Sequence, residues 1–161
     1  MGRTIRLGNG PGVRRENHAM ADDPYRDDSI WDTWAKSVIM IRVADGREVR
    51  AGSAPLPWIG ATHVITAWNP GRTRSRDENL VANERLREEL EAKGLEHRRA
   101  VGSSPDGSWS EEGFAVTGLS RAEATQLGRE FGQLAIYEIS GSTVVIIDCS
   151  DGRVLRTNMG T

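Results

Sequence analysis

Two segments of the chain share one helix-start pattern, and this pattern limits the folds that the sequence can adopt. Ser-Arg-x-Glu occurs at 75–78 and again at 120–123. In each copy the serine hydroxyl and the glutamate carboxylate can bond each other's backbone amide, which is the capping box that begins a helix. Gly94 and Gly132 predict the two helix ends, because glycine readily adopts the left-handed conformation that follows a last turn. The chain therefore contains two capped helices set among other elements.

Short apolar runs around these helices predict a sheet. Asp-Gly pairs at 45–46 and 151–152 each separate two such runs, as in a two-residue hairpin turn. Further strands are expected at 63–68, 95–101, 114–118 and 134–139. We expect an α+β fold, a two-layer sandwich with two main helices on one face of a mixed, largely antiparallel sheet.

Composition sets the domain organisation and excludes several classes of function. Residues 1–28 are rich in glycine and charge without apolar periodicity, so we expect a disordered N-terminal tail and a single domain over 29–161. The net charge of -2 and the single cysteine suit a cytoplasmic protein with no global attraction to nucleic acid. No apolar run reaches the ~18 residues of a membrane span, and no histidine or cysteine spacing predicts a metal site. We expect no cofactor and no membrane partner.

The first helix has asparagine where a core residue is expected. Asn79 and Asn83 fall on the same helical stripe as Leu86 and Leu90, so both amides point toward the protein interior. A buried amide without partners costs ~1–3 kcal/mol, so something must bond to them. They either hold the backbone of the preceding loop or line a pocket and bind a ligand.

The segment before this helix resembles an anion site. A strand ends at Asn69, a Pro-Gly turn follows, and Arg72 precedes the helix that begins at Ser75. A helix start presents free amides and a partial positive charge. Asn69, Arg72 and Ser75 are therefore candidate ligand-binding residues, although the arginine is equally explained as a solvated loop charge.

Three residues farther along complete the candidate site. Trp109 lies in a loop of small and polar residues, where its ring either packs on the core or faces a ligand. Glu111, in the same loop, is a candidate catalytic acid or base if the tryptophan desolvates it, and a helix-capping or ion-pair residue otherwise. Gln133 either caps the second helix or faces the same cavity.

The order of these motifs resembles a known family. The series ITAWNPG, then N…N..L…L…G, then W.E and FGQ.AI is similar to the bacterial domain of unknown function family 3293. It runs from Ile65 through Trp109 and Glu111 to Ile136. The resemblance implies a small hydroxyl residue, often serine, two places after the motif glutamate, where this chain has Gly113.

The sequence leaves three functions open, and it does not decide whether a reaction is catalysed. The first is a small-molecule site, with or without a catalytic role, for an anionic or nucleotide-like ligand. The second is a protein-interaction or regulatory module with Trp58 or Trp109 as an exposed anchor. The third is local RNA binding, which the charge balance disfavours, through Arg72, Arg74, Arg76, Arg98 and Arg99.

Overall fold

Strand β3 lies inside the sheet and is buried on both faces. The computed structural model describes residues 28–70 and 73–157. The strands are β1 (Val38–Arg42), β2 (Glu48–Arg50), β3 (Thr62–Thr66), β4 (His97–Ser103), β5 (Ser110–Thr117), β6 (Ala135–Ser140), β7 (Thr143–Asp148) and β8 (Val154–Arg156). The helices are α1 (Asp28–Ala35), α2 (Arg76–Ala92) and α3 (Arg121–Glu130). In β3, four successive side chains are buried, so both faces of the sheet are covered at this strand.

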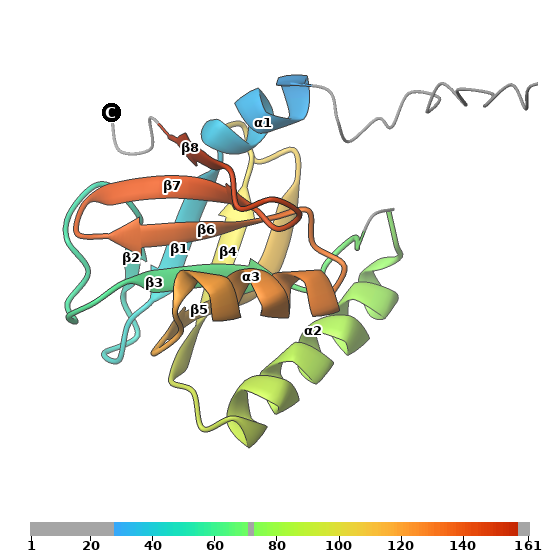
Figure 1. Ribbon diagram of the computed structural model, residues 1–161, viewed down its shortest axis with the longest axis horizontal. Coiled ribbons are helices and arrows are strands. Elements are labelled where there is room, and N and C mark those ends of the chain that lie inside the picture. Colours follow the sequence, from blue (N-terminus) through green and yellow to red (C-terminus); the bar gives the residue numbers. More distant parts are fainter. Residues whose placement is uncertain (1–27, 71–72, 158–161) are drawn as a thin grey trace, which may run out of the picture.

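All eight strands form one curled antiparallel sheet. Their order is β2-β1-β4-β5-β3-β6-β7-β8, and each neighbouring pair is antiparallel. The sheet bends into a half-barrel, so that β1 and β4 cross the direction of β6 and β7 (Figure 1). Strands twist with a fixed hand, and the twist accumulates over this many strands into curvature. The curl gives the sheet a convex outer face and a concave inner face.

Helices α2 and α3 pack on the outer face. Leu86 and Leu90 of α2 share one buried cluster with Leu127 of α3 and with Ile65 and Ile147 of the sheet. The two capping boxes are present as predicted, with Ser75 and Ser120 as the N-cap residues. Both helices therefore cover the same face of the sheet, with α3 lying across its middle strands (Figure 1).

The inner face buries a second apolar cluster that includes Ile39, Val64 and Ala115. Helix α1 lies at the edge of this face. The Tyr137 hydroxyl on β6 donates a hydrogen bond to the Trp34 carbonyl, 3.1 Å away. The guanidinium of Arg153 lies over the Trp31 ring, 4.8 Å from its centroid. These contacts attach α1 to β6 and to the turn before β8.

The predicted fold class is wrong. A two-layer sandwich with two main helices on a mixed, largely antiparallel sheet was expected, but the described residues form mostly sheet, with eight antiparallel strands and three small helices. The apolar pattern of β3 and β7 shows that both faces are covered, yet it does not reveal what covers them. Here the curl of the sheet itself buries the second face.

The predicted tail, residues 1–28, lies outside the described residues except for Asp28. Helix α1 begins at Asp28, the last residue assigned to the tail, and the sequence analysis had placed no helix there. Within the described part of the chain, no helix has the length and apolar character that crossing a membrane requires.

The two helix caps predict a measurable loss of stability. Ser75→Ala and Ser120→Ala each remove the hydroxyl that accepts the amide of the glutamate three residues on. We expect each change to lower the free energy of unfolding by ~0.5–2 kcal/mol in chemical denaturation. Ser142→Ala, in the exposed turn between β6 and β7, is the matched control and should leave the midpoint unchanged. Equal midpoints for all three variants would contradict the capping role.

Candidate functional site

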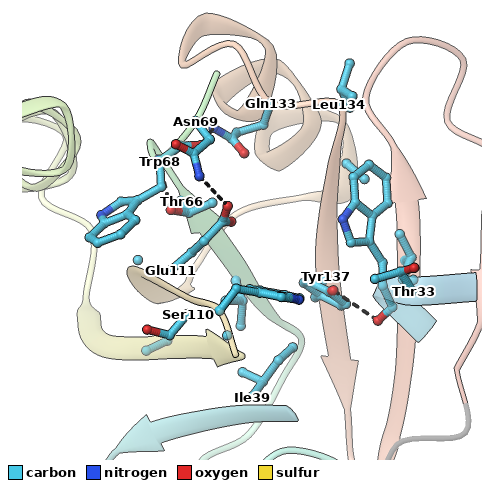
Figure 2. Close-up of a pocket in the computed structure, with 18 of the residues that line it drawn as sticks. Thr33, Ile39, Thr66, Trp68, Asn69, Ser110, Glu111, Gln133, Leu134 and Tyr137 are labelled. Atoms are coloured by element: carbon cyan, nitrogen blue, oxygen red, sulfur yellow. Dashed lines mark hydrogen bonds between the residues drawn. The ribbon is translucent and has the colours of Figure 1, made fainter. Parts of the chain in front are cut away.

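A cavity of about 390 Å³ opens on the inner face of the sheet, beside α1 (Figure 2). Its walls come from α1, from β1 and β3 to β7, and from the turns after β3 and α3. Most lining side chains are apolar or aromatic, including Trp34, Ile39, Val64, Trp68, Trp109, Leu134 and Tyr137. The polar lining residues include Thr66, Asn69, Ser110, Glu111 and Gln133. A small set of polar groups on an apolar wall is typical of a small-molecule pocket.

Glu111 is the one acidic or basic side chain among the described lining residues. Its Oε1 accepts a hydrogen bond of 3.0 Å from Asn69 Nδ2, toward which the carboxyl group points (Figure 2). Its Oε2 accepts no hydrogen bond from any described residue. Burial raises the pKa of this carboxyl, and the Asn69 bond offsets part of that rise.

The loop predicted to carry Glu111 is instead part of β5, where Glu111 pairs with Gly102 of β4. That prediction was wrong because the segment is built of glycine, serine and glutamate, which have little intrinsic preference for strands. Pairing with β4 imposes the extended conformation. Strand alternation then directs Glu111 to the inner face and Glu112 to the outer face.

Asn69 is held in an unusual conformation by Asn79. Its φ of 47° lies in the left-handed region, which only a few per cent of non-glycine residues adopt. Asn69 N–H donates to Asn79 Oδ1 at 2.9 Å, and Asn79 Nδ2 donates back to Asn69 Oδ1 at 3.0 Å. Asn69 Oδ1 also accepts the Arg74 amide at 3.0 Å. The side chain that bonds Glu111 is therefore fixed at both its backbone and its carbonyl oxygen.

Residues just after α3 fix the other side of the same turn. Gln133 Nε2 donates to the carbonyl of Trp68 at 3.0 Å and to that of Phe131 at 3.3 Å. Gly132 has a φ of +72°, and a Cβ there would lie 2.5 Å from Pro70 Cβ. The Phe-Gly-Gln motif thus needs glycine both for backbone conformation and for close packing on the turn.

Aromatic residues from two distant elements form much of the wall. Trp109 is positioned by the hairpin turn between β4 and β5, where its N–H donates to Ser104 Oγ and its carbonyl accepts from Ser104 N–H. Tyr137 stands on β6, and burial raises the pKa of its hydroxyl. That hydroxyl stays protonated near neutral pH and bonds the carbonyl of Trp34.

Two glycines on the inner face differ in the space around them. A Cβ on Gly102 would meet no atom within 4 Å, so this glycine leaves open volume directly beside Glu111. A Cβ on Gly113 would lie 2.5 Å from the backbone oxygen of Ile65. The hydroxyl residue that the family resemblance implies at this position would therefore clash here without a backbone shift.

The structure brings four of the eight predicted site residues to the cavity, namely Asn69, Trp109, Glu111 and Gln133. The predicted ligand residues Asn79 and Asn83 are buried, as the helical stripe predicts, but neither lines the cavity. Asn79 holds the loop, and Asn83 Oδ1 is buried without a hydrogen-bond partner among the described residues. Ser75 is the N-cap of α2. Arg72 lies outside the described residues.

The sequence analysis missed Trp34, Tyr137 and Gly102. Gly102 could have been identified from the sequence, because a glycine inside a strand often marks close approach by a ligand or another backbone. Trp58, proposed as an exposed anchor, is half-buried, and its Nε1 donates to Thr62 Oγ1 at 2.7 Å. Within the described chain, no group of three or more His, Cys, Asp and Glu residues has the arrangement to hold a metal ion.

Comparison with known families gives one match. Residues 65–136 match the model described as "Protein of unknown function (DUF3293)", which confirms the resemblance to domain of unknown function family 3293. The matched segment contains Asn69, Asn79, Glu111 and Gln133. No curated protein and no solved structure matches the chain.

The amide network makes Asn79 a structural residue whose loss should destabilise the protein. Asn79→Leu leaves the partly buried Asn69 N–H without its acceptor and removes one of the two donors to Asn69 Oδ1, so we expect a loss of ~1–3 kcal/mol in the free energy of unfolding. Asn83→Leu is the matched control on the same helix face. It removes an oxygen that has no partner and should be neutral or stabilising in the same denaturation experiment. A stable Asn79→Leu variant would contradict this role.

The raised pKa of Glu111 predicts a pH-dependent stability difference. The folded protein holds the Glu111 proton more tightly than the unfolded chain does, so ionisation lowers stability as pH rises through the folded pKa. Glu111→Gln should therefore raise the melting temperature at pH 8, with a difference that disappears toward pH 4, below the unfolded value of 4.5. Glu112→Gln, next in sequence but paired with Arg99 on the outer face, should show no such gain in thermal scans. A lower melting temperature for Glu111→Gln at pH 8 would refute the assignment.

Proposed function

We propose that this protein binds a small molecule in the inner-face cavity, with Glu111 as the polar anchor. The observation that carries the proposal is a half-buried carboxylate on a mostly apolar and aromatic wall, with one oxygen that bonds to none of the described residues. Holding a carboxyl group in such a place lowers stability. A ligand that bonds to Glu111 would offset that loss.

The dimensions of the cavity support a small ligand. Its volume of about 390 Å³ lies within the range of about 300–1,000 Å³ that is usual for small-molecule sites. The side chain of Glu111 is already oriented by Asn69, which in turn is fixed by Asn79. A site whose polar group is held in place before binding loses less entropy when the ligand arrives.

Two observations favour a neutral or cationic ligand over the anionic one expected from the sequence. The described lining residues include no lysine or arginine, and their one charged group is a carboxylate. The start of α2 also carries Asp77 and Glu78 in its first turn, and the Ser75 hydroxyl already accepts the Glu78 amide. Negative charge there disfavours an anion.

The same lining residues favour binding over catalysis. The described lining residues include no histidine, cysteine or lysine that would act beside Glu111 as a second acid, base or nucleophile. The Tyr137 hydroxyl is committed to the Trp34 carbonyl. One carboxylate on a rigid wall supports recognition better than a two-group proton transfer.

The proposal is tested by closing the cavity without disturbing the fold. Gly102→Val places a side chain into open volume beside Glu111, and valine suits a strand better than glycine does. We expect a thermal-shift screen of metabolites to give ligands that raise the melting temperature of the wild type and leave that of Gly102→Val unchanged. The variant itself should be as stable as wild type or slightly more so.

Ser103→Val is the matched control for this screen. It makes a similar substitution at the next position of β4, where strand alternation directs the side chain to the outer face. Ligand shifts should persist in this variant. Hits that shift Gly102→Val as much as wild type would place binding elsewhere and overturn the proposal.

A further inference from the structure

We infer that the cavity selects an organic cation with N–H donors on an aromatic or alkyl body, such as an amidinium or a protonated amine. This inference rests on the proposed function, because it names the class of ligand for the same site. It follows from which hydrogen-bonding atoms of the wall are already used, from the charge of the wall and from the rings around it.

Several hydrogen-bond donors of the wall are used within the protein. Gln133 Nε2 bonds two backbone carbonyls, and the Thr66 hydroxyl donates to the Glu112 carbonyl at 2.6 Å. Tyr137 donates to Trp34. The indole Nε1 of Trp68 has no partner but is sealed from solvent, so a ligand in the cavity cannot reach it in this conformation.

Two acceptors of the wall are open to a ligand. Glu111 Oε2 accepts nothing from a described residue, and neither does the side-chain oxygen of Gln133. Both side chains point toward the same end of the cavity, beside Asn69 (Figure 2). A ligand with N–H groups would satisfy these acceptors, whereas a ligand with carboxylate or phosphate oxygens would face them with a second set of acceptors.

The charge of the wall also favours a cationic ligand. Glu111 carries the one formal charge among the described lining residues, and it is partly removed from water. In such an environment an opposite charge is attracted more strongly than in bulk water, and a like charge is repelled more strongly. The ion pair with a cation would also lower the pKa of Glu111, so cation binding should weaken as pH falls and the carboxyl takes up its proton.

The aromatic walls favour a cation with a flat or apolar body. Trp34, Trp68, Trp109 and Tyr137 all line the cavity, and ring faces attract cations within about 6 Å. Elsewhere the same chain already places cations on tryptophan. Arg98 lies 4.2 Å from the centroid of the Trp58 ring, and Arg153 lies over Trp31. Neither of these tryptophans lines the cavity, and among the described residues no cation lies over the rings that do.

A series of three molecules of nearly equal shape tests the inference. Benzamidine is a cation at pH 8, benzamide is neutral and benzoate is an anion, while all three carry one phenyl ring. Isothermal titration calorimetry of the full chain at pH 8 should show benzamidine binding at least about tenfold more tightly than benzamide, with benzoate weakest. The affinity for benzamidine should fall between pH 8 and pH 4.

Two variants assign this preference to the cavity. Glu111→Gln should reduce the affinity for benzamidine by about tenfold or more and change that for benzamide by less than about threefold. Gly102→Val should abolish binding of both, whereas Ser103→Val should leave both unchanged. This pattern would support the inference even if Glu111→Gln were poorly folded, because the Gly102 and Ser103 variants report the location independently.

The inference and the proposed function fail in different ways. Benzamidine binding that is absent, or no tighter than that of benzamide or benzoate, would overturn the cation class. The cavity itself would remain the binding site if screen hits still failed to shift Gly102→Val. Ligands that raise the melting temperature of Gly102→Val as much as that of wild type would instead overturn the proposed function, whatever their charge.

Discussion

The reciprocal amide pair of Asn69 and Asn79 is the interaction on which the rest of the site depends. Asn69 has a left-handed backbone that a non-glycine residue adopts at some energetic cost, so other contacts must hold it there. Asn79 supplies both an acceptor for the Asn69 amide and a donor for its side-chain oxygen. Because that oxygen is fixed, the remaining Asn69 amide group faces Glu111 and sets the direction of the carboxylate. A leucine at position 79 would pack well on the outer-face core, but it would release this chain of contacts.

The curvature of the sheet creates the cavity that this network serves. A flat sheet would expose its second face or require a second layer of helices, whereas the curled sheet buries an apolar cluster against itself. The curl leaves a gap where β4 carries Gly102 and β5 carries Glu111, and α1 closes the gap from one side. Gly113, two residues after Glu111, has the opposite role. Its missing side chain lets β5 approach the backbone of β3, which keeps the middle of the sheet tight.

The Glu111 carboxylate affects both the stability of the fold and the proposed binding of a ligand. The carboxyl is less stable as an anion in the cavity than in water, which is why its pKa is raised. Protein stability is lowered by such a group when the site is empty, and a cationic ligand would restore part of that stability by pairing with it. The proposed cationic ligand would account for both the open acceptor on Glu111 and the surrounding rings, because it would bring N–H donors to a wall that provides shape and negative charge.

The sequence by itself determined the features that depend on near neighbours. Ser75 and Ser120 begin their helices as predicted, because a capping box joins residues three apart, and the stripe through Asn79 and Asn83 correctly marks both as buried. Only the tertiary structure decided what these residues touch. Asn69 and Glu111 are 42 residues apart, and they meet because β3 and β5 pair antiparallel in a curled sheet. Pairing with β4 and β3 also makes β5 extended, although the composition at its start is typical of a loop. The second face of β3 is covered by the curled sheet itself, where we had expected a layer of helices. Periodicity records which side chains are buried, but the partner that buries each one is set by strand order and curvature, which involve residues far apart in the chain.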